Sequence, residues 1–438
     1  MVSRICCRSG QDDERGPAAK REDEEEEEEE DQVEEQQRQK KEEGTSIWGG
    51  LPDQLVERVL AFLPLKDVIR MRCVCKKWSE DTRSTSFAKL HAMFSCSSSR
   101  EQQQKPWFIV CTGKRRFLSY DVNSCSWKLL SVSCLPDPDL QVLASSRGLL
   151  CYGFRWGELT STDLYVCNPV TKKWEHLPPH PEQMVDHFGM AYDETTSAYK
   201  ILTMNAAASS SVGGGAFSSS TGGSNSIRDV RVYDSRTKKW TPGVLPKPSM
   251  HFGKSPMVFC NGWFFLMDRM RPFCELFAYN IEQCVWKELQ SVSPHYFEYP
   301  SLVECGGGRL FMIGIVKDCH RIWEVVINNQ EKEEEDCREM MKLVLYETLP
   351  SQFPNEFKVR RVSSLVGAGR CPNYNPFRLN AIGSSKNLIC FTSNIDYSWV
   401  LVYNTELRTF HWSSKDPIHP SLSDYAGVSF QPCLAASP

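Results

Sequence analysis

The chain has 438 residues and a formal net charge of −4 at pH 7, a length typical of two or three domains. It contains no run of about 18 apolar residues, which excludes a membrane-spanning helix, and its first residues are too polar for a secretory signal. Its 19 cysteines are scattered and form no Cys-x-x-Cys pair. This usage favours buried reduced thiols over disulfides or structural zinc, so we expect a protein of the nucleus, the cytoplasm or both.

Residues 1–45 are dominated by acidic side chains. Residues 1–44 hold 17 acidic and 8 basic residues, including ten consecutive acids from Glu22 to Asp31. Such a segment repels itself and has nothing to bury, so we predict a disordered tail, with docking to a basic partner as the alternative. The remaining chain is net +5, too weak and diffuse a charge to indicate direct nucleic-acid binding.

Residues 46–92 contain two short segments with helical periodicity. Pro52 stands where a first helical residue would be, and apolar residues then recur at three- and four-residue spacing as far as Leu63. Pro64 ends that helix because it has no amide hydrogen to donate. A second helical segment starts near Lys66 and leads into Trp78. A unit this short cannot bury a sufficient hydrophobic core by itself. We therefore expect it to dock onto another domain or protein.

The order of these residues resembles the F-box, which in its family joins a substrate receptor to a Skp-family adaptor of cullin-based ubiquitin ligases. The match runs from Leu51-Pro52 through Leu63-Pro64-Leu65 to Val68-Ile-Arg-x-Arg-x-Val-Cys-Lys-x-Trp78. The alternative is a helical cap on the next domain. The resemblance implies adaptor binding by Leu51, Pro52, Leu55, Val59, Leu63, Pro64, Leu65, Val68, Val74 and Trp78.

We expect these ten side chains to divide between a surface and a small core. Pro52, Leu55, Leu65 and Val68 are expected largely at the adaptor surface. We expect the next four to divide between the interface and the internal core: Val59, Leu63, Val74 and Trp78. Arg72 and Lys76 are expected to add polar contacts at the rim of the interface.

After a polar linker at 93–106, residues 107–436 are predicted to be all-β. Short apolar strands alternate with turns, and a tyrosine strand, an Asp or Asn turn and a tryptophan strand recur, as in Tyr233-Asp234 to Trp240. The tryptophans are 47, 66, 46 and 126 residues apart, which fits propeller blades of 46–47 residues with flexible inserts at 206–226 and 329–342. This spacing predicts six blades, with five or seven as alternatives, and closure by pairing Trp107–Cys111 with a strand such as 427–430.

The repeats resemble the kelch-type propellers of plant F-box/kelch proteins. Val166-Cys-Asn168-Pro169-Val-Thr171-Lys-Lys-Trp174 and Val232-Tyr-Asp234-Ser-Arg-Thr237-Lys-Lys-Trp240 carry the likeness. The double glycine of a kelch repeat is clear only at Gly306–Gly308. The predicted fold is therefore α+β and multidomain, with a small all-α F-box followed by an all-β propeller.

The sequence contains no recognisable catalytic or metal-binding constellation. It has neither a phosphate-binding Gly-x-x-x-x-Gly-Lys-Ser/Thr loop nor a Gly-x-Ser-x-Gly elbow. The prolines around His176, His180 and His187 disrupt metal-ligand spacing, so we expect these histidines on a surface loop. The blade tryptophans are interpreted as core residues. We predict no enzyme activity, no cofactor and no metal.

These features predict a substrate-recognition subunit of a Skp–cullin–F-box ubiquitin ligase. The F-box would bind the Skp-family adaptor, and through it the cullin, while the propeller would hold an unidentified protein substrate. Neither direct nucleic-acid binding nor membrane association is expected. The alternatives are a transcriptional co-regulator or a non-degradative protein-binding scaffold, and an enzyme that uses the propeller as its scaffold.

Overall fold

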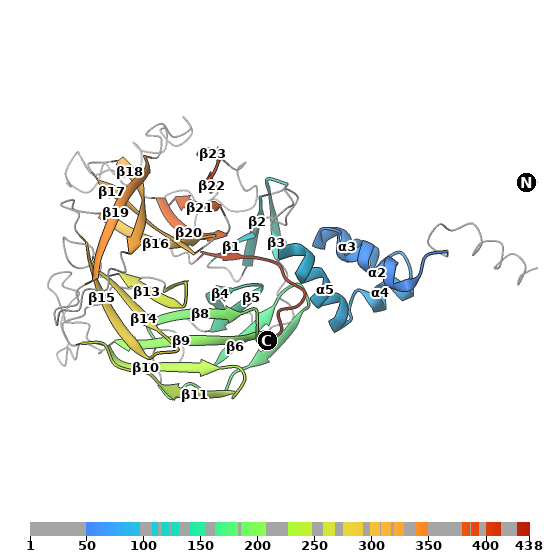
Figure 1. Cartoon of the computed structure of the whole chain (residues 1–438), viewed down its shortest axis with the longest axis horizontal. Coiled ribbons are helices and arrows are strands. Elements are labelled where there is room, and N and C mark those ends of the chain that lie inside the picture. The colour runs from blue at the N-terminus through green and yellow to red at the C-terminus, as the bar shows by residue number, and fades with distance from the viewer. Residues whose placement is uncertain are drawn as a thin grey trace, which may run out of the picture.

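A computed structural model gives the arrangement of most of the helical unit and the strands (Figure 1). The predicted acidic tail lies outside the described residues, as do 207–226 and 329–338 of the two predicted inserts. The structure describes residues 50–96, 107–112, 116–122, 124–130, 140–153, 163–182, 185–206, 227–247, 257–267, 275–291, 298–306, 308–316, 319–327, 339–348, 379–385, 387–393, 400–412 and 427–438.

The helical unit contains four described helices. They are α2 (Asp53–Ala61), α3 (Leu65–Met71), α4 (Lys76–Asp81) and α5 (Thr85–Cys96). Pro52 and Pro64 stand immediately before α2 and α3 with extended ψ angles of 138° and 145°, where a missing amide hydrogen costs the helix nothing. Helix α5 continues to Cys96, beyond the domain boundary predicted at residue 92.

The β region forms six four-stranded antiparallel blades among the described residues, as predicted. The first blade contains β1 (Trp107–Thr112), β2 (Arg116–Asp121), β3 (Ser126–Leu130) and the C-terminal strand β24 (Gly427–Phe430). The second contains β4 (Gln141–Ser146), β5 (Leu149–Gly153), β6 (Leu164–Asn168) and β7 (Lys173–His176). The third contains β8 (His187–Asp193), β9 (Ala198–Ala206), β10 (Ile227–Asp234) and β11 (Lys239–Pro242).

The other three blades complete the ring. They are built from β12 (Val258–Cys260), β13 (Trp263–Met267), β14 (Glu275–Asn280) and β15 (Val285–Ser291); from β16 (Glu298–Cys305), β17 (Arg309–Val316), β18 (Cys319–Ile327) and β19 (Glu339–Thr348); and from β20 (Leu379–Ser385), β21 (Leu388–Ser393), β22 (Val400–Asn404) and β23 (Thr409–Trp412). The innermost strands β24, β4, β8, β12, β16 and β20 contact one another in that circular order, with β20 returning to β24.

The propeller closes by pairing distant parts of the chain. Strand β24 pairs antiparallel with β1, and the register places Trp107 opposite Phe430 and Val110 opposite Gly427. This confirms the closure predicted from the sequence. A closed ring leaves no open sheet edge at the junction between the first and last blades.

In three blades the repeated tyrosine and tryptophan lie opposite each other on the two outer strands, whereas in the β4–β7 blade Trp174 lies opposite Cys167. Tyr233 pairs with Trp240 and Tyr279 with Trp286, with ring centroids 5.3 Å and 4.8 Å apart. The tyrosines are fully buried. The indole of Trp240 donates a hydrogen bond to the Pro178 carbonyl oxygen at 2.9 Å, so the outer aromatic residue also joins neighbouring blades.

The blade of β16–β19 departs most from this repeat. Its outer strand β19 starts at Glu339, within the charged insert predicted at 329–342. That strand also pairs in parallel with β15 of the preceding blade, with Leu289 opposite Glu339. The two blades therefore form one continuous eight-stranded sheet.

Candidate adaptor-binding surface

Helix α2 has an apolar side that faces inward and a second apolar side that faces solvent. Val56 and Leu60 are buried in the core of the helical unit. Leu55, Val59 and Phe62 are 46%, 43% and 44% exposed. Because these three residues recur at four and three positions, they lie along one helical face. This face is an exposed apolar surface.

Ile69 on α3 and Val74 in the turn after it are further exposed apolar side chains of the same helical unit. Leu65 and Val68, expected largely at the adaptor surface, are instead completely buried. This corrects the expectation of their exposure. They lie three positions apart on the side of α3 that faces the core, and Ile69 takes the outward position.

The remaining predicted residues form the border between core and surface. Leu51, Leu63 and Trp78 are partly buried and pack against the core cluster, whereas Pro52 and Pro64 are exposed. The predicted set omitted Phe62 and Ile69, although both belong to the apolar pattern of their helices. Their outward positions depend on how the helices pack, which the spacing does not specify.

Polar contacts fix the helices that carry this surface. His91 Nε2 on α5 donates to the carbonyl oxygen of Leu63 at 3.1 Å, which fastens α5 to the break between α2 and α3. Burial lowers the pKa of His91 below its ordinary value of 6.5, against the opposing effect of that hydrogen bond. The imidazole therefore favours its neutral form in the folded unit.

Arg72 is part of this internal scaffold, although we expected it at the rim of the interface. Its Nη2 donates to the Thr82 carbonyl oxygen at 3.1 Å, and its Nε donates to Thr82 Oγ1 at 3.3 Å. Burial, followed by the charge of Arg83, lowers the pKa of Arg72. Lys76 is exposed, and the adjacent Lys77 forms an ion pair with Asp53 of α2.

The helical unit contacts the propeller on another side. Leu434, which follows β24, belongs to the same buried cluster as Val56, Leu60 and Phe87. Val170, from the turn between β6 and β7, also packs against that cluster. In Figure 1 the segment after β24 runs beside α5.

The histidines predicted on a surface loop are mostly internal. His180 is buried and its Nε2 lies 2.8 Å from Thr203 Oγ1. His187 is buried on β8, whereas His176 is exposed and its Nε2 lies 3.1 Å from Asp163 Oδ1. Within the described ranges, no cluster of three or more His, Cys, Asp or Glu side chains is arranged to hold a metal ion.

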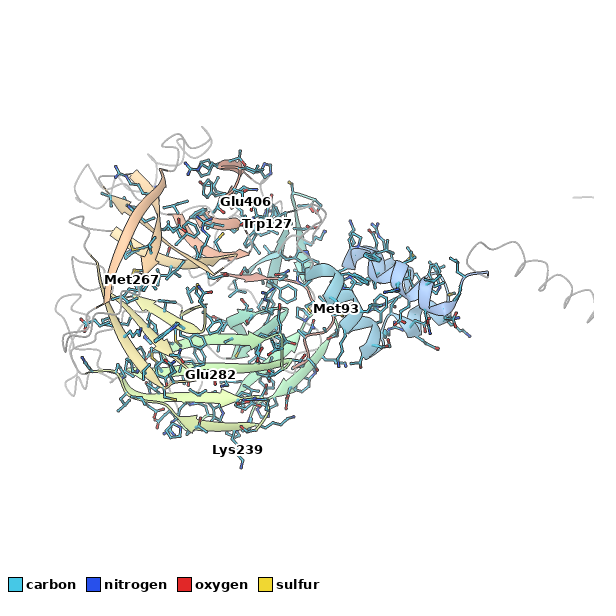
Figure 2. The ribbon with its side chains drawn as sticks, in the orientation of Figure 1. Met93, Trp127, Lys239, Met267, Glu282 and Glu406 are labelled. Carbon is cyan, nitrogen blue, oxygen red and sulfur yellow. The ribbon has the colours of Figure 1, made fainter. Side chains whose placement is uncertain are left out.

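The tryptophans interpreted as core residues are only partly buried where their side chains are described. Trp127, Trp240 and Trp286 are half-buried, and Trp174 is 42% exposed. Trp127, Trp240 and Trp286 pack beside buried tyrosines instead of filling the blade interior, whereas Trp174 packs beside the half-buried Tyr165. Figure 2 shows Trp127 and Met267 in different parts of the propeller and Met93 on α5.

No helix in the described part of the chain is both long and apolar enough to cross a bilayer.

Comparison with protein families matches both regions. Residues 48–80 match the F-box domain, and residues 120–298 match the family described as F-box protein At3g26010-like, beta-propeller. The chain therefore combines an F-box domain with a β-propeller similar to that of an F-box protein family. The first match contains α2, α3 and most of α4, and the second covers strands from β2 to the beginning of β16.

Two of the similar plant proteins are named F-box/kelch-repeat proteins. F-box/kelch-repeat protein At3g61590 of Arabidopsis thaliana is 28% identical over 227 residues, covering 50% of this chain and 51% of its own. F-box/kelch-repeat protein At5g43190 of Arabidopsis thaliana is 25% identical over 424 residues, covering 90% of this chain and 89% of its own. The matches to At3g61590 and to F-box only protein 6 of Arabidopsis thaliana span about half of those relatives, 51% and 56% of their lengths.

Proposed function

We propose that this protein is the substrate-recognition subunit of a Skp–cullin–F-box ubiquitin ligase. The F-box binds a Skp-family adaptor, and the propeller binds the protein to be modified. The chain itself performs no chemistry. It brings lysines of the bound protein within reach of a ubiquitin-loaded enzyme that other subunits recruit, so catalysis is by proximity. We propose that it acts in the nucleus, the cytoplasm or both.

The observation that carries this proposal is the exposed apolar face of the F-box. Leu55, Val59 and Phe62 lie outward on α2 while the opposite side of that helix fills the core. Ile69 and Val74 extend the same exposed apolar character to α3 and the turn after it. Exposed apolar side chains that line one face of a small helical unit indicate a protein interface. A partner with an apolar groove is the occupant that this face suits.

The decisive experiment measures the affinity of the full chain for a purified Skp-family adaptor. Leu55→Ala with Val59→Ala should weaken binding by about a hundredfold or more, because a fully buried side chain of this kind contributes about 1.5–3 kcal/mol. Far-ultraviolet circular dichroism and the melting temperature should remain as in the unmodified protein. The two residues are already half-exposed before any partner binds.

A matched control uses two leucines that are also exposed, but on the propeller. Leu129 and Leu407 are 60% and 70% exposed, and their replacement by alanine should leave adaptor affinity unchanged. No binding by the unmodified chain, where another F-box protein binds the same adaptor, would refute the proposal. Normal adaptor binding without any change in target abundance on F-box deletion would favour the co-regulator or scaffold function.

A further inference from the structure

The side chain of Asn168 makes four hydrogen bonds at the end of β6. Its Oδ1 accepts from the backbone amides of Val170 and Thr171 at 3.0 Å and 3.3 Å, which closes the turn to β7. Its Nδ2 donates to the carbonyl oxygens of Cys433 and Ala436 at 2.8 Å and 2.7 Å. Asn168 is fully buried. One amide group therefore shapes a turn and also holds the segment that follows β24.

Residues 431–438, called the strap here, pack against both regions of the protein. Ala436 is buried in the cluster between the β4–β7 and β8–β11 blades, and Cys433 packs against that cluster. Leu434 points into the core of the F-box instead. Neighbouring residues of one short segment thus bury their side chains in different domains.

The propeller surface beneath the strap is shaped for close approach. Gly148, in the turn between β4 and β5, has a φ of +87°, which favours glycine. A Cβ atom there would lie 2.8 Å from Cys433 Cβ and 3.1 Å from the Cys433 backbone nitrogen. Ser145 Oγ donates to the Ser429 carbonyl oxygen at 2.7 Å just before the strap begins.

Among the described residues of two other blades, an asparagine closes the equivalent turn but makes no bond to the strap. Asn280 accepts from the amides of Glu282 and Gln283, and Asn404 accepts from the amides of Glu406 and Leu407. Both are half-buried, unlike the fully buried Asn168. The protein therefore contains the same turn with strap bonds, at Asn168, and without them, at Asn280 and Asn404.

We propose that the strap is an internal docking element that fixes the F-box on the β4–β7 blade through Asn168 and Leu434. By fixing the F-box, it sets the direction in which the propeller presents a bound protein to the ligase. This second statement rests on the proposed function. The partner of this propeller surface is therefore a segment of the chain itself, held there by two amide-to-carbonyl bonds from Asn168, while Leu434 anchors the same segment in the F-box core.

The test is Asn168→Asp in the full chain, followed by hydrogen–deuterium exchange. Aspartate retains the acceptor that closes the turn but loses both donors and places a carboxylate against two carbonyl oxygens. Exchange in residues 431–438 should become about tenfold to a hundredfold faster, because two buried hydrogen bonds are lost. Small-angle scattering should show a wider distribution of distances between the F-box and the propeller. Adaptor affinity should stay within about threefold, because the face containing Leu55 and Val59 is unchanged.

The matched controls are Asn280→Asp and Asn404→Asp, which make the same chemical change in turns without strap bonds. Both should leave exchange in the strap unchanged. Leu434→Ala is the second variant; it keeps the bonds to Asn168 and should accelerate exchange in α2 and α5.

Three results would refute the proposal that the strap fixes the F-box. The first is an exchange rate of the strap in Asn168→Asp equal to that of the unmodified protein, and the second is equal acceleration in a control variant. The third is an exchange rate of α2 and α5 in Leu434→Ala equal to that of the unmodified protein. A chain that binds no adaptor would instead defeat the proposed function, while exchange and scattering would still decide whether the strap holds the F-box. If Asn168→Asp widens the distance distribution yet ubiquitin transfer proceeds at the unmodified rate, the presentation role is wrong.

Discussion

The F-box and the propeller handle their apolar residues in opposite ways. Each blade of the propeller packs its inner faces against its neighbours, so aromatic side chains such as Phe264 and Phe391 are completely buried. The F-box buries a few residues in one cluster, borrows Leu434 from outside, and leaves Leu55, Val59 and Phe62 in solvent. Within the described residues, the blades bury their large aromatic side chains against one another, whereas the F-box leaves apolar side chains along one face of a helix for another molecule to cover.

The largest effect is expected from the propeller core. Phe264→Ala should lower the free energy of unfolding of the propeller by about 3–5 kcal/mol, because a fully buried aromatic side chain leaves a cavity. Calorimetry would measure the loss. Because the adaptor-binding face lies on the F-box, adaptor affinity should be unchanged at a temperature where the propeller remains folded. Loss of adaptor binding under conditions where the propeller remains folded would break the comparison.

Leu60→Ala in the F-box sharpens the comparison from the other side. Leu60 is almost fully buried, so we expect a loss of about 2–5 kcal/mol, which a unit this small cannot absorb. Exchange in α2 and α5 should approach that of an unfolded segment while the strands remain protected. Leu55→Ala is the matched variant, one that should leave exchange unchanged. Equal exchange in both variants would contradict the assignment of inner and outer faces.

Acid should weaken the F-box through His91. Burial lowers its folded-state pKa below 6.5, so the unfolded state binds the proton more readily. The contribution is therefore fully present above about pH 6.5 and is lost as the pH falls toward the folded pKa. Exchange in α5 should accelerate between pH 7 and pH 5.5, after correction for intrinsic rates. His91→Gln should remove most of this dependence. Because burial also lowers the pKa of His320 to about 4, the strands around β18 provide a comparison at lower pH.

The smallest effect is expected at an ion pair between blades. Lys238 Nζ lies 2.6 Å from Glu175 Oε1, but the lysine side chain is largely exposed. Lys238→Met should change the melting temperature little, because an exposed pair contributes about 0–1 kcal/mol. A loss comparable to that of Phe264→Ala would mean that polar contacts, not buried apolar area, hold the blades together.

Much of the architecture was predictable because its signals are local. Pro52 marked the start of the first helix and Pro64 its end, and the tyrosine, turn and tryptophan pattern marked most blades. The blade of β16–β19 lacks that pattern, so its place depended on counting residues. Closure by β24 was predictable because an unpaired strand at 107–111 needs a partner.

The details of the site were harder to predict because they depend on packing between distant segments. Apolar spacing within a seven-residue helix identified Val68 and Ile69 without showing that the first is buried and the second exposed. Asn168 and Asn404 occupy similar sequences, and the chain's own segment at 433–436 distinguishes them. A pattern within one element carries no information about which remote residue reaches it.

The position of Leu434 has a consequence for the order in which the protein matures during synthesis. The F-box is translated first, yet one of its core residues is translated after every blade of the propeller, as is the strand that closes the ring. Until both have left the ribosome, the first domain is missing part of its core and the second is an open array. Such an intermediate exposes apolar surface for chaperones to recognise. A chain truncated before residue 427 would therefore damage both domains at once, so incomplete products are unable to act as partial receptors.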